Sequence, residues 1–406
     1  MNILKSVKER FLQYIQIDTQ SSDESDTFPT TLKQLDLAAL LADECKSIGL
    51  KDVCLDKNGY VYASLPSNIN TETPAIGFIA HMDTSPDCSG ESVKAKITHN
   101  YDGGDIVLGS NKTLSPNEFP GLKKYAGLDI ITTSGDTLLG ADDKAGLAEI
   151  LTAMEYLIEN PDIPHGKICV GFTPDEEVGR GVDRFDLKTF GAVYAYTVDG
   201  GEVGELESEN FNAARAIANI TGKSVHTGTA KGIMINAALI AAELASRMPE
   251  NEIPAKTDGY EGFYHLLNLQ GNVEQAKAVF LIRDFDIGSF NARKAFMEKT
   301  VSELNDKYGG ALELNLYDEY FNMAGPLAEH GHVINLAFRA MEDTGVKPIR
   351  KPIRGGTDGS RLCFMGLPCP NIFTGGHNAH GPYEYIPLQS MGKAVEVIVN
   401  ISKTHI

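Results

Sequence analysis

Short apolar runs alternate with amphipathic stretches over the first half of the chain. Apolar residues recur at helical spacing in residues 4–17, 32–41 and 144–157. Continuous apolar runs predict buried strands, at residues 60–65, 76–80, 168–173 and 193–198. Helices that alternate with short buried strands favour an α/β domain with three layers, α/β/α. Residues 84–140 are rich in Gly, Ser, Asp and Thr, which predicts loops and hairpins.

The pattern changes in the middle of the chain. Alternating or β-rich runs predict strands at residues 212–221, 276–283 and 311–317, and helical spacing occurs at 236–247 and 291–307. After residue 324 the first pattern returns, with a helix at 334–342, a strand at 371–374 and a helix at 389–402. We therefore predict a main α/β domain from residues 1–208 and 319–406, into which a smaller α+β sandwich, residues 209–318, is inserted.

Polar side chains follow four of the predicted strands, at the point where each strand ends. They are His81 and Asp83, the run Asp175-Glu176-Glu177, Asp199, and the pair His377 and His380. Open α/β sheets bind their ligands at the carboxyl ends of the strands. We therefore expect these side chains to form one polar constellation, and their residue types indicate a metal site that performs chemistry.

Composition narrows the classes of partner. The 406 residues contain 36 Lys and Arg against 55 Asp and Glu, a formal net charge of −19, which argues against a nucleic-acid partner. No apolar run approaches the roughly 18 residues of a membrane helix, so no membrane partner is expected. The six cysteines show no C-x-x-C spacing, which argues against a disulfide framework and a cysteine zinc site. We expect a cytoplasmic protein.

The constellation has the donor types of a two-zinc site. Zinc takes imidazole nitrogens and carboxylate oxygens, and in a two-metal site one carboxylate commonly bridges ions about 3.5–4 Å apart. Adjacent carboxylates such as Glu176 and Glu177 can point differently, one to a metal and one to water. Taken singly, each motif has a simpler explanation, such as a helix cap for Asp142-Asp143 or a turn at Asp199. Their coincidence at separate strand ends favours the metal site.

Five motifs, in order along nearly the whole chain, resemble those of the M20 family of dizinc peptidases. They are AHMDT at 80–84, GADDKAG at 140–146, PDEEVG at 174–179, VDG at 198–200 and NAHG at 378–381. The resemblance implies a three-layer catalytic domain with an inserted lid domain. It also implies two Zn²⁺ per subunit, for which Co²⁺ or Mn²⁺ could substitute because they suit the same ligands.

The resemblance assigns a role to each residue of the constellation. It implies that His81 and Asp199 hold one zinc, that Glu177 and His380 hold the other, and that Asp143 bridges them. Glu176 would be the general base, and Asp83 would orient His81 from behind. A cis peptide bond would lie between Asp142 and Asp143. His377 competes with His380 for the ligand position, but the motif places the ligand just before Gly381, which leaves His377 at the rim or behind the ligands.

Three residues outside the constellation become candidates through the same resemblance. His226 would stabilise the oxyanion, although Thr227 follows it where many relatives have proline. Arg354, together with Arg283, would hold the carboxylate or a carbonyl of the peptide, because arginine can clamp a carboxylate with two parallel hydrogen bonds. Their simpler explanations are a surface-loop histidine, a strand arginine paired with Asp284, and a loop cation.

The implied activity is that of an aminopeptidase on short peptides with a free N-terminus, chiefly tripeptides. One alternative is an M20-type deacylase or carboxypeptidase that acts on N-blocked substrates. Another is a non-catalytic metal- or peptide-binding protein, against which the presence of Glu176 beside Glu177 speaks. The metal used, the side-chain preference and the oligomeric state, with a homodimer as one alternative, stay open at this level.

Overall fold

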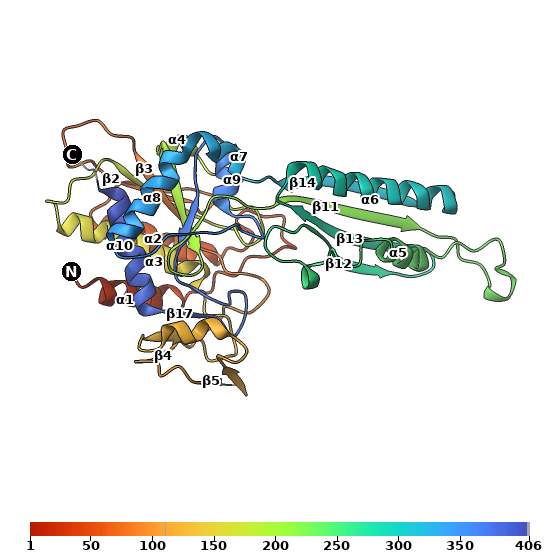
Figure 1. Ribbon diagram of the computed structural model, residues 1–406, viewed down its shortest axis with the longest axis horizontal. Coiled ribbons are helices and arrows are strands. Elements are labelled where there is room, and N and C mark those ends of the chain that lie inside the picture. Colours follow the sequence, from red (N-terminus) through yellow and green to blue (C-terminus); the bar gives the residue numbers. More distant parts are fainter. Residues whose placement is uncertain (110, 404–406) are drawn as a thin grey trace. The chain divides into compact units, whose positions relative to one another are not determined.

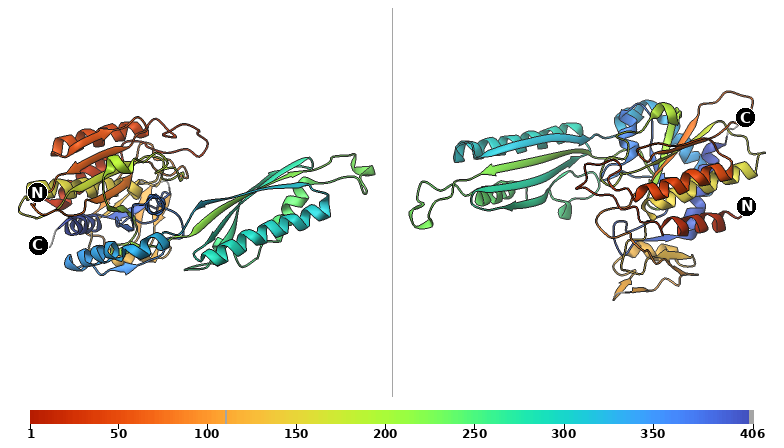
Figure 2. Two further views of the ribbon diagram at one scale, coloured as in Figure 1. Left: turned by 90° about the horizontal axis from the view of Figure 1, so that it is seen from above. Right: turned by 180° about the vertical axis from the view of Figure 1, so that it is seen from behind.

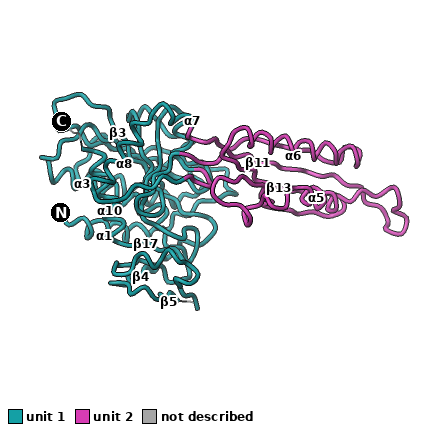
Figure 3. Tube along the Cα trace, viewed as in Figure 1, with its two compact units in different colours: residues 1–208, 325–351, 357–406 teal, residues 209–324, 352–356 magenta. Residues whose placement is uncertain are grey.

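A computed structural model describes residues 1–109 and 111–403. Position 110, within the segment expected to form loops and hairpins, and positions 404–406, at the end of the expected main domain, lie outside the described residues. The chain divides into two compact units, coloured separately in Figure 3. Unit 1 consists of Met1–Ser208, Gly325–Lys351 and the chain from Thr357 onward, and unit 2 consists of Glu209–Ala324 and Pro352–Gly356.

An eight-stranded sheet, in the order β1-β2-β8-β3-β9-β16-β10-β15, forms the centre of the described part of unit 1. Its inner strands β8, β3, β9 and β16 run parallel, whereas β2 pairs with β8, and β10 with β16, in antiparallel fashion. The bounds are β1 Lys51–Leu55, β2 Val61–Leu65, β3 Ile76–His81, β8 Ile168–Thr173, β9 Tyr194–Gly200, β10 Glu205–Glu207, β15 Ile349–Arg350 and β16 Asn371–Phe373.

Helices cover both faces of this sheet (Figure 1). On β3, Phe78 belongs to the hydrophobic core that α1, α3 and α10 share, whereas Gly77 faces the ring of Phe190 on the opposite side, where any Cβ would clash. The helices are α1 Ile3–Tyr14, α2 Gln34–Ile48, α3 Ala141–Glu159, α4 Leu187–Phe190, α8 Gly331–Asp343, α9 Asp358–Phe364 and α10 Leu388–Ser402. The predicted three-layer α/β class is confirmed. Among the described residues, no helix combines the length and the apolar character that crossing a membrane requires.

Residues 96–109 and 111–132 form more regular structure than the predicted loops and hairpins. A three-stranded sheet has the order β17-β7-β4. The strands β5 and β6, which lie between β4 and β7 in the sequence, form a separate two-stranded sheet. Tyr101, Leu114, Tyr125 and Tyr385 are among the residues of a separate small hydrophobic core there. The elements are β4 Lys96–Thr98, β5 Ile106–Gly109, β6 Lys112–Leu114, the 3₁₀ helix η1 Pro120–Tyr125, β7 Ile130–Thr132 and β17 Tyr385–Pro387.

Unit 2 is an α+β sandwich in which two helices pack on one face of an antiparallel sheet (Figure 2). The sheet order is β12-β13-β11-β14, and alternate residues of β11, such as Ala214, Ala216 and Ala218, face the helices. The elements are β11 Asn212–Thr221, η2 Thr227–Thr229, α5 Ala237–Ser246, η3 Pro254–Lys256, β12 Phe263–Gly271, β13 Gln275–Asp284, α6 Ile287–Tyr308 and β14 Leu312–Tyr320; α7 Ala324–Leu327 and η4 Ala328–His330 follow.

The strand β12 does not appear among the elements predicted from the sequence. It is an edge strand whose outer part, from Leu266 to Gly271, is exposed, and its register shifts between Leu266 and Asn268. Burial therefore imposes no alternation of apolar and polar residues on it, and the period-2 pattern that reveals a half-buried strand is missing.

Candidate metal centre

The carboxyl ends of four neighbouring strands carry the polar constellation in unit 1. His81 ends β3, and Glu176 and Glu177 follow β8. Asp199 lies at the end of β9, and His380 lies in the loop that follows β16. Because β8, β3, β9 and β16 are adjacent and parallel, their carboxyl ends meet at one edge of the sheet. The start of α3 brings Asp142 to the same place.

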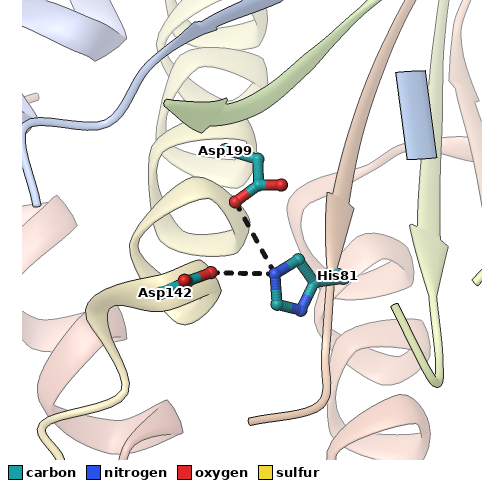
Figure 4. Close-up of side chains that lie close together, drawn as sticks. All are labelled: His81, Asp142 and Asp199. Atoms are coloured by element: carbon teal, nitrogen blue, oxygen red, sulfur yellow. Dashed lines mark hydrogen bonds and ion pairs between the residues drawn. The ribbon is translucent and has the colours of Figure 1, made fainter. Parts of the chain in front are cut away.

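The first set of possible ligands consists of His81, Asp142 and Asp199 (Figure 4). The Nε2 atom of His81 lies 2.9 Å from Oδ1 of Asp142 and 3.6 Å from Oδ1 of Asp199. One ligand atom from each residue lies within 4.8 Å of the other two. The imidazole is buried, with 2% of its side chain exposed, whereas the side chains of Asp142 and Asp199 are 27% and 12% exposed.

The second set consists of Asp142, Glu177 and His380. The Nε2 atom of His380 lies 2.9 Å from Oε2 of Glu177 and 3.3 Å from Oδ2 of Asp142. Asp142 therefore belongs to both sets and directs one oxygen towards each imidazole. A carboxylate shared in this way is the arrangement expected of a bridging ligand between two metal ions.

Asp143 takes a different place from the one predicted. Its side chain is fully buried; Oδ2 accepts the backbone N–H of His81 at 3.1 Å and Oδ1 accepts that of Gly146 at 3.2 Å. It thus joins the end of β3 to the first turn of α3 and belongs to neither set of ligands. Asp142, and not Asp143, is the carboxylate that both sets share, whereas the resemblance implied that Asp143 would bridge the two ions. The peptide bond between the two aspartates is cis.

Asp83 lies behind His81 and beneath the turn that carries the glutamates. Its Oδ1 accepts the backbone N–H of Glu176 at 2.9 Å, and its Oδ2 accepts that of Glu177 at 3.1 Å. Oδ1 also lies 3.4 Å from Nδ1 of His81. The side chain is fully buried, so it ties the ends of β3 and β8 together at the constellation.

The close packing of carboxylates changes their proton affinities. Burial, aided by the charge of Asp199, raises the pKa of Glu176 well above its ordinary value. Burial and the charge of Asp142 raise the pKa of Glu177 to about 8. Although burial acts in the opposite direction, hydrogen bonds from His380 and His81 hold the pKa of Asp142 below its usual range. A cluster of buried carboxylates without enough positive charge binds protons, and a bound cation would displace those protons.

The donor set fits divalent metal ions. Each set offers one imidazole nitrogen and two carboxylate oxygens, a mixture that suits Zn²⁺, Co²⁺ or Mn²⁺. The second oxygen of Glu177, Oε1, is buried and has no hydrogen-bond partner among the described residues. A buried carboxylate oxygen without a partner is costly, and a cation at this position would satisfy it.

His377 lies outside both sets of ligands. Its Nε2 atom is 2.6 Å from the hydroxyl of Tyr125, and its ring stacks on that of Tyr385 with centroids 4.8 Å apart. Burial lowers its pKa to about 4, so the ring is neutral and Nε2 can accept a hydrogen bond from the tyrosine hydroxyl. His377 therefore anchors the loop that carries His380.

The three other predicted site residues belong to unit 2. His226 is exposed, and its Nδ1 accepts the backbone N–H of Gly228 at 3.1 Å. Arg283 donates to Glu319 at 2.9 Å and to two backbone carbonyls of its own sheet, whereas Asp284 pairs with Arg293.

Arg354 is also engaged within unit 2. Its guanidinium donates to the carbonyls of Gly259, Glu261 and Thr257 and to the hydroxyl of Thr257. It also lies over the ring of Phe211, 5.1 Å from the centroid. Both arginines thus hold parts of unit 2 together in this structure.

The sequence analysis did not identify the residues that support the possible ligands. Asn371 accepts the backbone N–H of Asp199 at 3.2 Å and donates to Glu207 at 2.7 Å. Asp175, which carries no predicted role, accepts the backbone N–H and the hydroxyl of Thr30 and the amide of Gln34. Glu384 binds the turn before Asp142. No local pattern identifies such residues, because their partners are distant in the chain.

Comparison with known proteins gives a consistent set of similarities. The family model described as peptidase family M20/M25/M40 matches residues 138–404. The chain is 56% identical over 403 residues to a peptidase T of Alkaliphilus oremlandii, with 98% of both chains covered. It is also 56% identical over 403 residues to a peptidase T of Clostridium perfringens, with 99% of both covered.

Solved structures share the fold. The aminopeptidase PepT of Bacillus cereus has a TM-score of 0.77 and 25% identity, with 98% of both chains covered. A tripeptidase of Staphylococcus aureus has a TM-score of 0.78 and 22% identity over the same share of both chains.

Proposed function

The chain belongs to peptidase family M20/M25/M40 and is a hydrolase, and on this premise we propose that it is a two-metal aminopeptidase that removes the N-terminal residue of short peptides, chiefly tripeptides. Relatives named peptidase T, similar over nearly the full chain, and the fold shared with the aminopeptidase of Bacillus cereus support this proposal.

The observation that carries the proposal is the position of Asp142 between two imidazoles. Its two oxygens lie 2.9 Å from Nε2 of His81 and 3.3 Å from Nε2 of His380. We assign His81, Asp199 and Asp142 to one Zn²⁺ and Glu177, His380 and Asp142 to the other, with Co²⁺ or Mn²⁺ as substitutes. When bound, such ions act as Lewis acids on a peptide carbonyl and make water more acidic.

Glu176 is the proposed general base. Its backbone is fixed by Asp83, and its carboxylate forms no hydrogen bond with the described residues, so it is available to a water molecule. It takes one proton from the attacking water as the oxygen–carbon bond forms, and it gives that proton to the leaving amine as the carbon–nitrogen bond breaks. The same side chain therefore acts first as base and then as acid.

Unit 2 supplies the remaining proposed roles. His226 would stabilise the negative oxygen of the tetrahedral intermediate. Arg283 and Arg354 would bind the carboxylate of the peptide only if it replaced their present acceptors, Glu319 and the carbonyls around Thr257. Closure of unit 2 over a bound peptide would exclude water and limit substrate length.

We further propose that the enzyme works in the cytoplasm, with short peptides rather than nucleic acids or membranes as partners. The six cysteines are free in the structure, which is the usual state of thiols in a reducing compartment. A homodimer stays a proposal that the mass of the protein in solution would test.

A peptide-length series tests the proposed activity. We expect the purified protein to hydrolyse unblocked tripeptides faster than dipeptides and tetrapeptides, and to release the N-terminal amino acid. A chelator should abolish this activity and Zn²⁺ should restore it. Faster cleavage of N-acetylated tripeptides would replace the proposal with a deacylase or carboxypeptidase. Peptide binding without any cleavage in the presence of Zn²⁺ would indicate a binding protein.

A further inference from the structure

The carboxylate of Glu384 is bound by three backbone N–H groups of a distant segment. Its Oε2 accepts from Leu139 at 2.6 Å and from Gly140 at 2.8 Å, and its Oε1 accepts from Asp142 at 3.0 Å. The residue is 1% exposed. Three donors from four consecutive residues thus converge on one buried side chain.

The backbone of this segment is shaped to present those donors. Gly140 has φ +81° and ψ 27°, the left-handed conformation that glycine adopts readily. A left-handed residue turns successive N–H groups towards one side, and such concavities bind anions. The first N–H groups of α3 also have no acceptor within the helix. Glu384 supplies the anion that this turn would otherwise lack.

Glu384 and the ligand His380 belong to one closed loop. His377 and Tyr385 close it by exchanging backbone hydrogen bonds of 2.9 and 3.0 Å, and Tyr385 continues into β17. Within the loop, His380 has φ +64° and its side chain is 43% exposed, so burial alone does not hold it. The contact of Glu384 with the turn at Asp142 is therefore a direct link between this loop and the start of α3.

We propose that Glu384 is a positioning residue of the metal centre, which fixes the backbone of Asp142 relative to the loop of His380 before any cation binds. The inference deepens the proposed function and rests on the metal centre that it contains. Hydrogen bonds from N–H groups to a carboxylate are stronger than those between neutral groups, so the turn is held firmly. With the turn held, each oxygen of Asp142 meets one imidazole without reorganisation.

Substitution of Glu384 by glutamine tests this role in the metal-free protein. An amide keeps one acceptor oxygen but turns an NH₂ group towards a backbone donor, so at least one of the three bonds is lost. We expect Glu384→Gln to weaken Zn²⁺ binding, measured by titration calorimetry, by about 10- to 100-fold.

Glu149→Gln is the matched control. Glu149 is a fully buried glutamate of α3 that forms no hydrogen bond with the described residues. Its exchange should leave Zn²⁺ affinity within about 2-fold of the unmodified protein, well below the range expected for Glu384→Gln. Thermal unfolding in chelator, run on both variants, shows whether each is folded. Wild-type Zn²⁺ affinity in Glu384→Gln, or an equal loss in Glu149→Gln, would overturn the proposal.

Hydrogen exchange on the unmodified protein decides the matter if Glu384→Gln does not fold. The backbone amides of Leu139, Gly140 and Asp142 should be protected in metal-free protein, and rapid exchange there would equally overturn the proposal. If the wild-type chain bound no divalent cation at all, the proposed function would fail instead. The two failures are distinguishable, because rapid amide exchange concerns the turn at Asp142, whereas a complete lack of cation binding concerns the proposed ligands.

Discussion

At the scale of single residues, neighbours in the chain do different work. Asp142 directs its oxygens to two imidazoles, whereas Asp143 turns inward and accepts the N–H groups of His81 and Gly146. The same division separates Glu177, beside His380, from Glu176, whose carboxylate is free of hydrogen bonds to the described residues. Adjacent residues of the same type therefore differ in their contacts only because the backbone points their side chains in different directions.

The two aspartates should respond differently to substitution by asparagine. Asp142→Asn removes the charge shared by both sets of ligands, so we expect Zn²⁺ affinity to fall by at least about 100-fold, beyond the loss typical of a supporting residue. Asp143→Asn keeps one acceptor oxygen, and we expect it to lower stability by about 1–3 kcal/mol with two Zn²⁺ still bound. Elemental analysis after dialysis and thermal unfolding measure the two effects. Metal loss in Asp143→Asn alone would restore the original assignment.

Glu176 offers a second test at this scale. Replacement by glutamine keeps the shape but removes the group that accepts a proton, so we expect kcat to fall by about 10²- to 10⁴-fold. Metal content should stay unchanged, because neither set of ligands includes Glu176. Steady-state kinetics and elemental analysis on the same preparation check both statements. Near-normal turnover would remove Glu176 from the role of base.

At the scale of elements, strand ends and turns position the proposed ligands, and buried polar residues hold those turns. Asp83 ties the end of β3 to the turn after β8. Asp175 ties that turn to the segment that contains Thr30 and Gln34. These buried acids accept hydrogen bonds from backbone N–H groups and from a side-chain amide, and such bonds to a carboxylate hold the turns in place.

The helix α3 contains a contrasting acid, Glu149, whose carboxyl group has no partner among the described residues. Burial raises its pKa well above the ordinary value, so the folded protein keeps it protonated. Its contribution to stability is therefore fully present below about pH 4.5, near the pKa of an exposed glutamate, and declines as the pH rises towards the folded pKa.

Glu149→Gln should remove this dependence, because an amide stays neutral. Relative to the unmodified protein, the variant should gain about 1 kcal/mol or more in stability between pH 5 and pH 8. Thermal unfolding of both proteins in chelator at the two pH values measures the change, and the chelator keeps the metal ligands in the same state in both. A difference that did not change with pH would show that Glu149 is ionised in the folded protein.

At the scale of the whole molecule, the site is assembled from segments that are far apart in the chain. His81 and His380 are separated by nearly 300 residues, and the whole of unit 2 is inserted between the segments that supply Asp199 and His380. Both segments nevertheless contribute strands, β9 and β16, which pair in parallel within one sheet. The continuity of that sheet brings the proposed ligands together.

The sequence by itself determined the fold class, most of the helices and inner strands, and the residue types at the strand ends. Buried strands need apolar runs and helices need apolar residues at their own period, so the three-layer class follows from the pattern. The residues at the strand ends follow too, since His81, Glu177, Asp199 and His380 could be named without coordinates. The edge strand β12 could not, because its exposed face carries no pattern.

Only the tertiary structure decided which neighbouring acid faces which partner. The choice of Asp142 over Asp143, the support that Glu384 gives to their turn, and the engagement of Arg283 by Glu319 all depend on backbone direction and on contacts across more than 30 residues. The local pattern of apolar and polar residues indicates which positions are buried and whether they form a helix or a strand. It contains no information about the orientation of a side chain at a turn. That orientation is set by the distant groups that pack against it.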